Sequence, residues 1–380
     1  MFATYLLPVT TAVYVFPVLV LVVMLPVAFV SYRRRGRAGG WTTVVFYLFL
    51  FYLLAAFMQT VIPLPSDPTG YCATRSYASD PQLRPFYFLE VVDRRGGGDW
   101  SIGGMLNNPA LWSTGLNAIL LLPLGFFARY LNGMRFLAAT AVGFGTSLLF
   151  ELTQLTGLWF IYPCAYRLFS VDDLILNTAG ASLGWLIAGP LARILPDLQP
   201  ERDRRKYATR VTATRRLFAL FTDALGFAVL TGFVLGLVVL FGGQADAGLP
   251  VVAVLGLVWF WLVPAITGST VGKRAMLLRI SRPDGRRAGP FALLVRYGVL
   301  LSPLWLLWLA LSVDDWDVFA HPVQLLIPLG AVLSLLVVGI WTPLAVLFGG
   351  EAAPYERLSR TVNVAIVPKD EPADQQKVAS

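Results

Sequence analysis

The sequence predicts an all-α fold, a polytopic transmembrane helical bundle of about nine helices in two consecutive bundles. Hydrophobic residues make up 57% of the 380 residues, whereas charged residues make up only 14%. A soluble domain needs far more charge than this to cover its surface. A helix that crosses a bilayer needs about 20 apolar residues. Apolar stretches of sufficient length fall at residues 5–31, 41–63, 111–130, 135–157, 174–195, 217–241, 249–267, 291–312 and 323–348.

The positions of the basic residues predict that the N-terminus lies outside and the C-terminus in the cytoplasm. With this orientation, most of the 30 Lys and Arg residues fall in cytoplasmic connections, as the positive-inside rule requires. The first stretch ends in Arg33-Arg34-Arg35 rather than at a small-residue cleavage site, so it predicts a spanning helix and not a signal peptide. The net charge of +8 therefore reflects membrane topology, and we expect no nucleic-acid partner.

A polar and basic segment divides the apolar stretches into two groups. We expect a five-helix membrane domain at 1–195, a basic cytoplasmic linker at 196–210, a four-helix membrane domain at 211–367 and a polar cytoplasmic tail at 368–380.

The cysteine and histidine content limits the chemistry of the chain. Cys72 and Cys164, its only cysteines, fall in predicted outer loops, where an oxidising compartment permits a disulfide. Two unrelated thiols are the alternative, because spacing does not show proximity. The single histidine, His321, lies near Asp314, Asp315 and Asp317, but one His with flexible acids is a poor metal site. We expect no metal and no cofactor.

Polar side chains of the first group gather at one predicted depth near the outer surface. They are Asn117, Glu151, Gln154, Arg167, Asp172, Asp173 and Asn177. Glu151 and Gln154 lie one turn apart on one helix face, as do Asp173 and Asn177. A carboxylate within a span is costly and usually faces a partner or a cavity, so Glu151 is a functional candidate. The alternatives are that Asp172 and Asp173 only cap their helix and that Asn117 only bonds across helices.

The start of the fifth apolar stretch has two further patterns. Ser170-Val171-Asp172-Asp173 is typical of a capping box with Ser170 as the N-cap. Gly180 and Gly184 continue the stripe of Asn177, and small residues at this spacing let another helix approach closely.

The first half of the chain resembles the VanZ-like family. The resemblance covers roughly residues 1–195 and rests on Asn117 with Pro123-Leu124-Gly125, on Glu151-Leu152-Thr153-Gln154, on Arg167 and on Val171-Asp172-Asp173 through Asn177 to Gly180. Gln82-Leu83-Arg84-Pro85-Phe86 resembles the family's segment before its third helix, with Arg84 where an Asn is expected. The resemblance implies a bacterial membrane protein that faces the exterior and reduces susceptibility to teicoplanin-type glycopeptides, without a defined reaction.

A second group of charges lies near the predicted cytoplasmic surface of the second bundle. Asp223 follows Arg216 by seven residues on the same helix face, which places it about 10 Å deeper. Arg296 lies in the same leaflet. Pairing of Asp223 with Arg216 or Arg296 would lower the cost of burying these charges, and a structural ion pair is the alternative to a functional site.

The second half of the chain resembles the RDD family over about residues 211–367. The resemblance rests on Arg216, Asp223, Gly272-Lys273, Arg296 and the segment from Glu356 to Val362, with Glu356 where an Asp is expected. It implies membrane transport or assembly, and ion exchange for some relatives.

Three functions are compatible with these groups, all in the bacterial cell membrane. The favoured one is non-enzymatic binding of a membrane lipid, a lipid-linked cell-wall precursor or a glycopeptide antibiotic, with Arg167 meeting a phosphate or carboxylate. The second is a membrane enzyme that acts on a lipid headgroup through Glu151, Asp172 and Asp173, although no nucleophile or His base accompanies them. The third is a proton- or cation-coupled transporter that uses Asp223 and Glu151, although the two bundles are not evident repeats.

Overall fold

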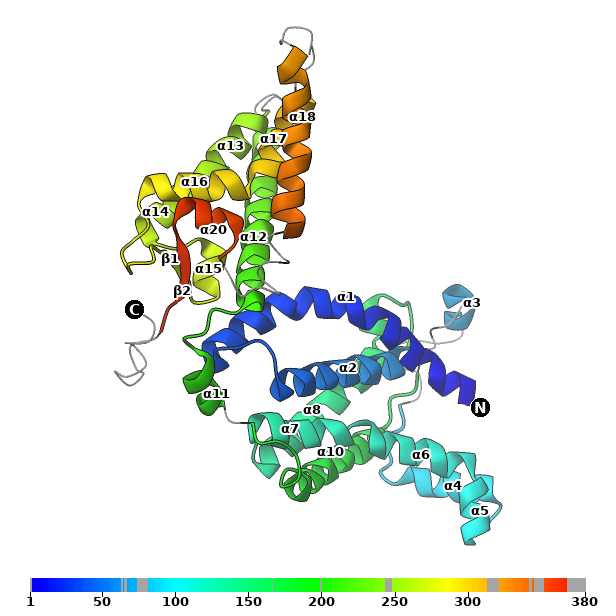
Figure 1. Ribbon diagram of the computed structural model, residues 1–380. Coiled ribbons are helices and arrows are strands. Elements are labelled where there is room, and N and C mark those ends of the chain that lie inside the picture. Colours follow the sequence, from blue (N-terminus) through cyan, green and yellow to red (C-terminus); the bar gives the residue numbers. More distant parts are fainter. Residues whose placement is uncertain are drawn as a thin grey trace. The chain divides into compact units, whose positions relative to one another are not determined.

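The computed structural model describes residues 2–62, 64, 67–73, 81–165, 167–198, 200–242, 248–312, 321–341, 344 and 352–367. In this part of the chain the elements are helices, apart from one two-stranded sheet (Figure 1). Seven of the described helices are long and apolar enough to cross a membrane. The predicted all-α class is therefore confirmed, and the chain is a multi-pass membrane protein.

The long helices coincide with seven of the predicted apolar stretches. They run over Leu7–Arg35, Trp41–Val61, Pro109–Asn132, Phe136–Leu155, Val171–Leu191, Ala213–Leu240 and Pro250–Thr267. The eighth stretch breaks into α16 (Pro290–Leu300) and α17 (Ser302–Ser312), because Pro303 has no N–H with which to continue the helical hydrogen bonds. The ninth forms α18 (His321–Leu335), which the π-helix η4 (Leu336–Trp341) continues.

The chain forms two compact units. The first comprises Met1–Val23 and Gly39–Leu198, and the second comprises Met24–Ala38 and Gln199–Ser380. Helix α1 (Phe2–Arg35) thus contributes residues to both units.

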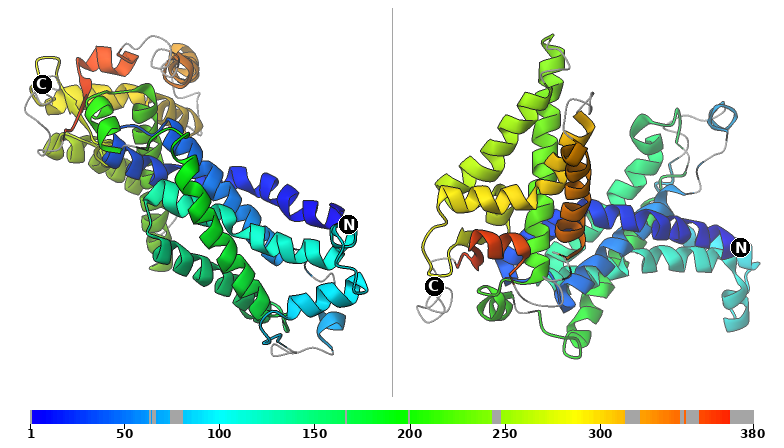
Figure 2. Two further views of the ribbon diagram at one scale, coloured as in Figure 1. Left: turned by 90° about the horizontal axis from the view of Figure 1, so that it is seen from below. Right: turned by 45° about the horizontal axis from the view of Figure 1, so that its top comes forward.

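Five helices build the core of the first unit, and they can be followed in both views of Figure 2. They are α2 (Trp41–Val61), α6 (Pro109–Leu120), α7 (Leu122–Asn132), α8 (Phe136–Leu155) and α10 (Val171–Leu191). Helix α10 packs against α6, α7 and α8. A Cβ on Gly180 would lie 1.8 Å from the carbonyl oxygen of Ala118, and one on Gly184 would lie 1.8 Å from that of Leu122. The close approach predicted for these glycines is confirmed.

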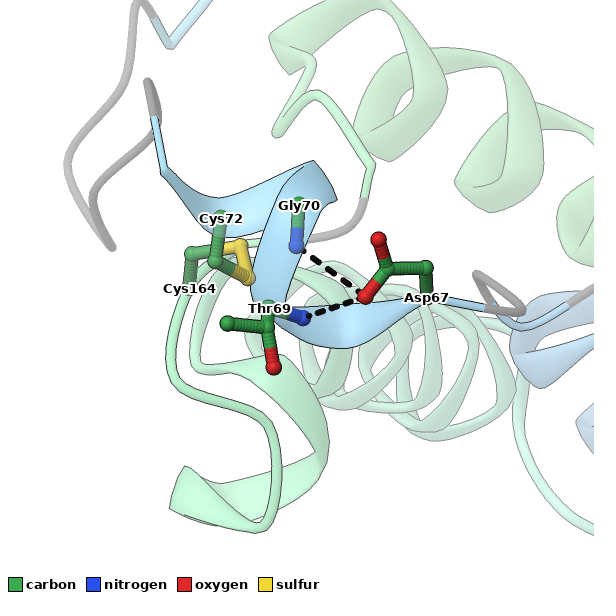
Figure 3. Close-up of a disulfide and its surroundings, with 5 residues drawn as sticks. All are labelled: Asp67, Thr69, Gly70, Cys72 and Cys164. Atoms are coloured by element: carbon green, nitrogen blue, oxygen red, sulfur yellow. Dashed lines mark hydrogen bonds between the residues drawn. A yellow bond between two sulfur atoms is a disulfide. The ribbon is translucent and has the colours of Figure 1, made fainter.

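Short helices and a disulfide organise the connections of the first unit. These helices are α3 (Pro68–Cys72), α4 (Tyr87–Gly96), α5 (Ile102–Asn107) and α9 (Gly157–Phe160). Asp67 Oδ1 accepts hydrogen bonds from the N–H groups of Thr69 and Gly70 at the start of α3 (Figure 3). A disulfide joins Cys72 at the end of α3 to Cys164, with 5.5 Å between the two Cα atoms (Figure 3).

The second unit combines helices with a short sheet. Its remaining helices are α11 (Pro200–Tyr207), α12 (Ala213–Leu240), α13 (Gly248–Leu257), the π-helix η2 (Val258–Leu262), α14 (Val263–Thr267), α15 (Val271–Ala275) and α20 (Pro354–Ser359). Strand β1 (Leu278–Ser281) pairs antiparallel with β2 (Val362–Ala365), so that Leu278 lies opposite Ala365. The sheet was not part of the predicted fold. It forms where buried Leu278 and Ile280 flank exposed Arg279, which is the alternation that a strand with one buried face requires.

Candidate functional site

Glu151 is the least exposed acid of the polar group in the first unit. It lies in α8 and is 3% exposed. Its Oε2 atom accepts a hydrogen bond of 2.9 Å from the N–H of Ser170, just before α10. Glu151 also interacts electrostatically with Asp173 and Arg167. The structure therefore brings these three predicted side chains together, two carboxylates and one guanidinium.

Asp173 lies in a chain of hydrogen bonds that joins three helices. Asn117 on α6 donates from Nδ2 to Oδ1 of Asp173 on α10. Ser147 on α8 donates to the carbonyl oxygen of Asp173 at 3.3 Å and accepts from Asn177 Nδ2 at 3.0 Å. The Oδ1 atom of Asn177 is buried and has no hydrogen-bond partner among the described residues. Both predicted asparagines therefore bond across helices.

Arg167 and Gln154 hold the end of α2. Arg167 donates to the carbonyl oxygens of Gln59 and Ile62 at 3.3 and 3.4 Å. Gln154 Nε2 donates to the carbonyl oxygen of Thr60 at 3.1 Å. The last four carbonyl groups of a helix have no partner within it, so these two side chains supply donors that the helix itself cannot.

Asp172 holds the start of α4 and does not cap its own helix. It is 5% exposed, and its two oxygens accept hydrogen bonds of 2.6 and 2.7 Å from the N–H groups of Phe86 and Phe88. The predicted capping box at the start of α10 is wrong, because Ser170 occupies the N-cap position without a side-chain cap bond. The carboxylates of this first turn bind partners on other elements instead.

The segment of residues 82–86, which is part of the family resemblance, docks beside α10. The N–H of Gln82 donates to the carbonyl oxygen of Phe169 at 2.8 Å, and the N–H of Val171 donates to the carbonyl oxygen of Gln82 at 3.0 Å. This parallel bridge, together with the bonds of Asp172, fixes residues 82–88 over the start of α10.

Besides Oδ1 of Asn177, the side chains of Glu151 and Asp173 have unused hydrogen-bonding capacity. In the described part of the chain, each of these carboxylates has one oxygen that accepts no hydrogen bond from the protein. With Arg167 beside them, they offer acceptors and a cation to a polar ligand. The described residues contain no cluster of three or more His, Cys, Asp or Glu able to hold a metal. Asp314, Asp315, Asp317 and the side chain of His321 lie outside the described residues.

The charges of the second unit pair differently from the prediction. Asp223 bonds to neither Arg216 nor Arg296. Its Oδ1 accepts hydrogen bonds from the N–H of Gly272 at 2.7 Å and from Trp259 Nε1 at 3.3 Å, and its Oδ2 accepts one from Thr270 Oγ1. These hydrogen bonds of Asp223 join α12 to the start of α15. At the same place, Gly272 packs directly on the backbone of α12. Its oxygens are occupied by fixed donors, which favours a structural role over ion transport.

Glu356 is the partner of both arginines. Its Oε1 accepts from Arg296 Nη2 at 3.1 Å, and its Oε2 accepts from Arg216 Nη1 at 3.3 Å. Arg296 also donates to Thr361 and Asn363. The side chains of Arg296 and Glu356 are 0% and 1% exposed. Glu356 lies in a segment that is part of the RDD resemblance, but it is 60 residues away from Arg296, and nothing in the sequence indicates that the two side chains pair.

Arg215 was missed by sequence analysis altogether. It is fully buried, and its guanidinium donates to the carbonyl oxygens of Ala208, Arg210, Met276 and Leu277. The only sequence signal is its place beside Arg216 at the start of α12, which does not distinguish a buried arginine from a surface one.

Comparison with protein families divides the chain in the same way as its two groups of polar residues. Residues 49–194 match the VanZ/LLP1 family, and residues 210–349 match the RDD family. No curated protein and no solved structure matches the chain.

Proposed function

Because this chain is a fusion of a VanZ-like segment with an RDD segment, we propose that it acts in the bacterial cell membrane as a binding protein. Its VanZ-like unit binds the polar head of a membrane lipid or of a lipid-linked cell-wall precursor, without turnover. This binding reduces susceptibility to teicoplanin-type glycopeptides, as the family resemblance implies.

The observation that carries this proposal is the grouping of Glu151, Asp173 and Arg167. A buried carboxylate in a spanning helix is costly and is retained where it has a partner or a function. Glu151 is 3% exposed and has one hydrogen-bond donor from the described chain, the N–H of Ser170. Its second oxygen and the adjacent Asp173 and Arg167 together match a headgroup that carries hydroxyl donors and a phosphate.

The disulfide supports placing this group on the exterior side. Disulfides form and persist in oxidising compartments and are rare in the cytosol. Cys164 precedes Arg167 by three residues. A bridge at this position therefore favours an orientation in which the polar group lies at the outer surface of the membrane, where cell-wall precursors are used.

The test is the glycopeptide susceptibility of a bacterial host that expresses the wild type, Glu151→Gln or Asp173→Asn. We expect the wild type to raise the inhibitory concentration of teicoplanin and both variants to lose most of that protection. Glu90→Gln is the matched control, because Glu90 is a half-exposed acid of the same unit that pairs with exposed Arg84 and Arg94. Equal protection by all four proteins at equal membrane levels would refute the role of this polar group.

Binding and turnover are separated by the composition of the lipid pool. A binding protein leaves the amounts of lipid-linked precursors unchanged when Glu151 is replaced, whereas an enzyme shifts them. Transport is tested with Asp223→Asn, which would abolish ion flux if Asp223 carried the ion.

A further inference from the structure

The second unit contains a cavity that the proposed function does not use. Its volume is about 790 Å³. It lies between the turn that follows β1, the first turns of α16 and the segment from α20 into β2. One part of its lining is charged, and the other part is apolar.

The charged part of the lining carries a positive excess. Arg282, Arg357 and Arg360 line the cavity, together with the acids Asp284 and Glu356. The charge of Glu356 is already matched, because its two oxygens accept hydrogen bonds from Arg216 and Arg296, which are not part of the cavity lining. Asp284 is paired with Arg286 at 3.9 Å, so among the described residues of the lining Arg282 and Arg360 leave an excess of positive charge, and the cavity attracts an anion.

The apolar part of the lining opens outward. Phe291 and Val295 on α16 and Leu358 on α20 contribute to it. Phe291 is 76% exposed and Leu358 is 65% exposed. Large apolar side chains at the mouth of a cationic cavity fit a ligand with an anionic head and a hydrocarbon tail, and they do not fit a fully hydrated ion.

The cavity lies between an arginine-rich turn and an apolar helix. The turn that precedes α16 is rich in arginine, and α16 itself is an apolar helix of 11 residues. Clusters of Lys and Arg beside a membrane helix attract anionic lipid headgroups.

Arg360 occupies a backbone conformation that suits glycine better. Its φ is 50° and its ψ is 47°, in the left-handed region that ends α20. Glycine adopts this region without steric cost, so replacement of Arg360 by glycine removes the guanidinium without straining the backbone.

We propose that this cavity binds an anionic phospholipid. Arg282 and Arg360 hold the phosphate group, and Phe291 and Leu358 contact the first carbons of the acyl chains. Guanidinium groups bind phosphate through charge-assisted hydrogen bonds with a planar geometry that suits this contact.

The test measures binding of a phosphatidylglycerol with a fluorescent acyl chain to the purified full-length protein in detergent. We expect unlabelled phosphatidylglycerol to compete and phosphatidylcholine to compete at least about tenfold more weakly, since the zwitterionic headgroup lacks the net charge. Arg360→Gly and Arg282→Ala should each weaken binding about tenfold, the scale of one lost charge-assisted contact. Arg279→Ala is the matched control, because Arg279 is an exposed arginine of β1 outside the cavity lining.

Three results would overturn the proposal. The first is equal competition by the two phospholipids. The second is a loss of affinity with Arg279→Ala as large as that with Arg360→Gly, which would indicate non-specific attraction to the basic surface. The third is displacement of the fluorescent lipid by inorganic phosphate at the same concentration at which unlabelled phosphatidylglycerol displaces it. This result would assign the cavity to a soluble anion. A melting temperature of Arg360→Gly equal to that of the wild type shows that the comparison concerns a folded protein.

Discussion

Replacement of Glu356 by glutamine tests whether one carboxylate holds the second unit together. Each oxygen of Glu356 has two donors: Oε1 accepts from Arg296 and Asn363, and Oε2 accepts from Arg216 and from the N–H of Ala353. Glutamine keeps the shape of the side chain but carries no charge. It also converts one acceptor atom into an NH₂ donor, so at least one arginine loses its partner.

The structure sets the magnitude of the effect. The side chains of Arg296 and Glu356 are almost completely buried, so solvent does not screen the lost interaction. Removal of one partner from a buried ion pair costs about 3–5 kcal/mol, because the other charge stays buried without compensation. Arg296 retains its bonds to Thr361 and Asn363, which favours the lower end of this range. We expect the free energy of unfolding of the second unit to fall by about 3 kcal/mol.

The assay is unfolding by sodium dodecyl sulfate in mixed micelles, followed by tryptophan fluorescence. Glu90→Gln is again the control, because an ion pair between half-exposed side chains contributes only about 0–1 kcal/mol. The double variant Arg296→Met with Glu356→Gln should lose less unfolding free energy than the sum of the two single variants. Both charges of the buried pair are then absent, so neither one stays buried without its partner. A loss in Glu356→Gln no larger than that in Glu90→Gln would refute the reasoning.

Three further substitutions test the first unit. Gly180→Ala should destabilise it by about 1–3 kcal/mol through overpacking against α6, whereas Gly145→Ala, with open space around its Cβ, should be neutral or stabilising in the same unfolding assay. Serine in place of Cys72 or Cys164 should remove the mobility difference between reduced and oxidised protein on a gel and lower stability by about 2–4 kcal/mol, since the bridge closes a loop with a sequence separation of 92. Asp172→Ala should leave two N–H groups of α4 without their acceptor and increase proteolytic cleavage near the start of α4, and unchanged cleavage would contradict its anchoring role.

The fold class was predictable because a bilayer imposes a strong constraint on sequence. Spanning segments must satisfy their backbone hydrogen bonds internally, so long apolar stretches become helices. The sheet between β1 and β2 was harder to predict, because its strands have only four residues each and lie 81 residues apart. The break in the eighth stretch follows from Pro303, whose effect on a helix depends on how the surrounding chain packs.

The sequence indicated which residues form the polar group of the first unit, but it did not indicate which atoms their hydrogen bonds join. Helical spacing places Glu151, Asp173 and Asn177 at a shared depth, and the structure brings them close together. Spacing does not reveal that Asp172 binds a segment more than 80 residues earlier in the chain. In the second unit, too, spacing did not reveal the partner of Arg296, because that partner, Glu356, lies near the end of the described chain.

The polar side chains of the first unit can stabilise the fold or bind a ligand, and their positions alone do not separate these two roles. Helix ends near a membrane surface carry backbone groups without partners, and Asp172, Arg167 and Gln154 supply those partners. Their replacement is therefore expected to affect folding before it affects any ligand. Glu151 differs, because its described hydrogen bond uses a single oxygen that glutamine also provides. Glu151→Gln thus removes a charge while it keeps the bond to Ser170, so a loss of drug protection with unchanged stability would assign the charge of Glu151 to the ligand and not to the fold.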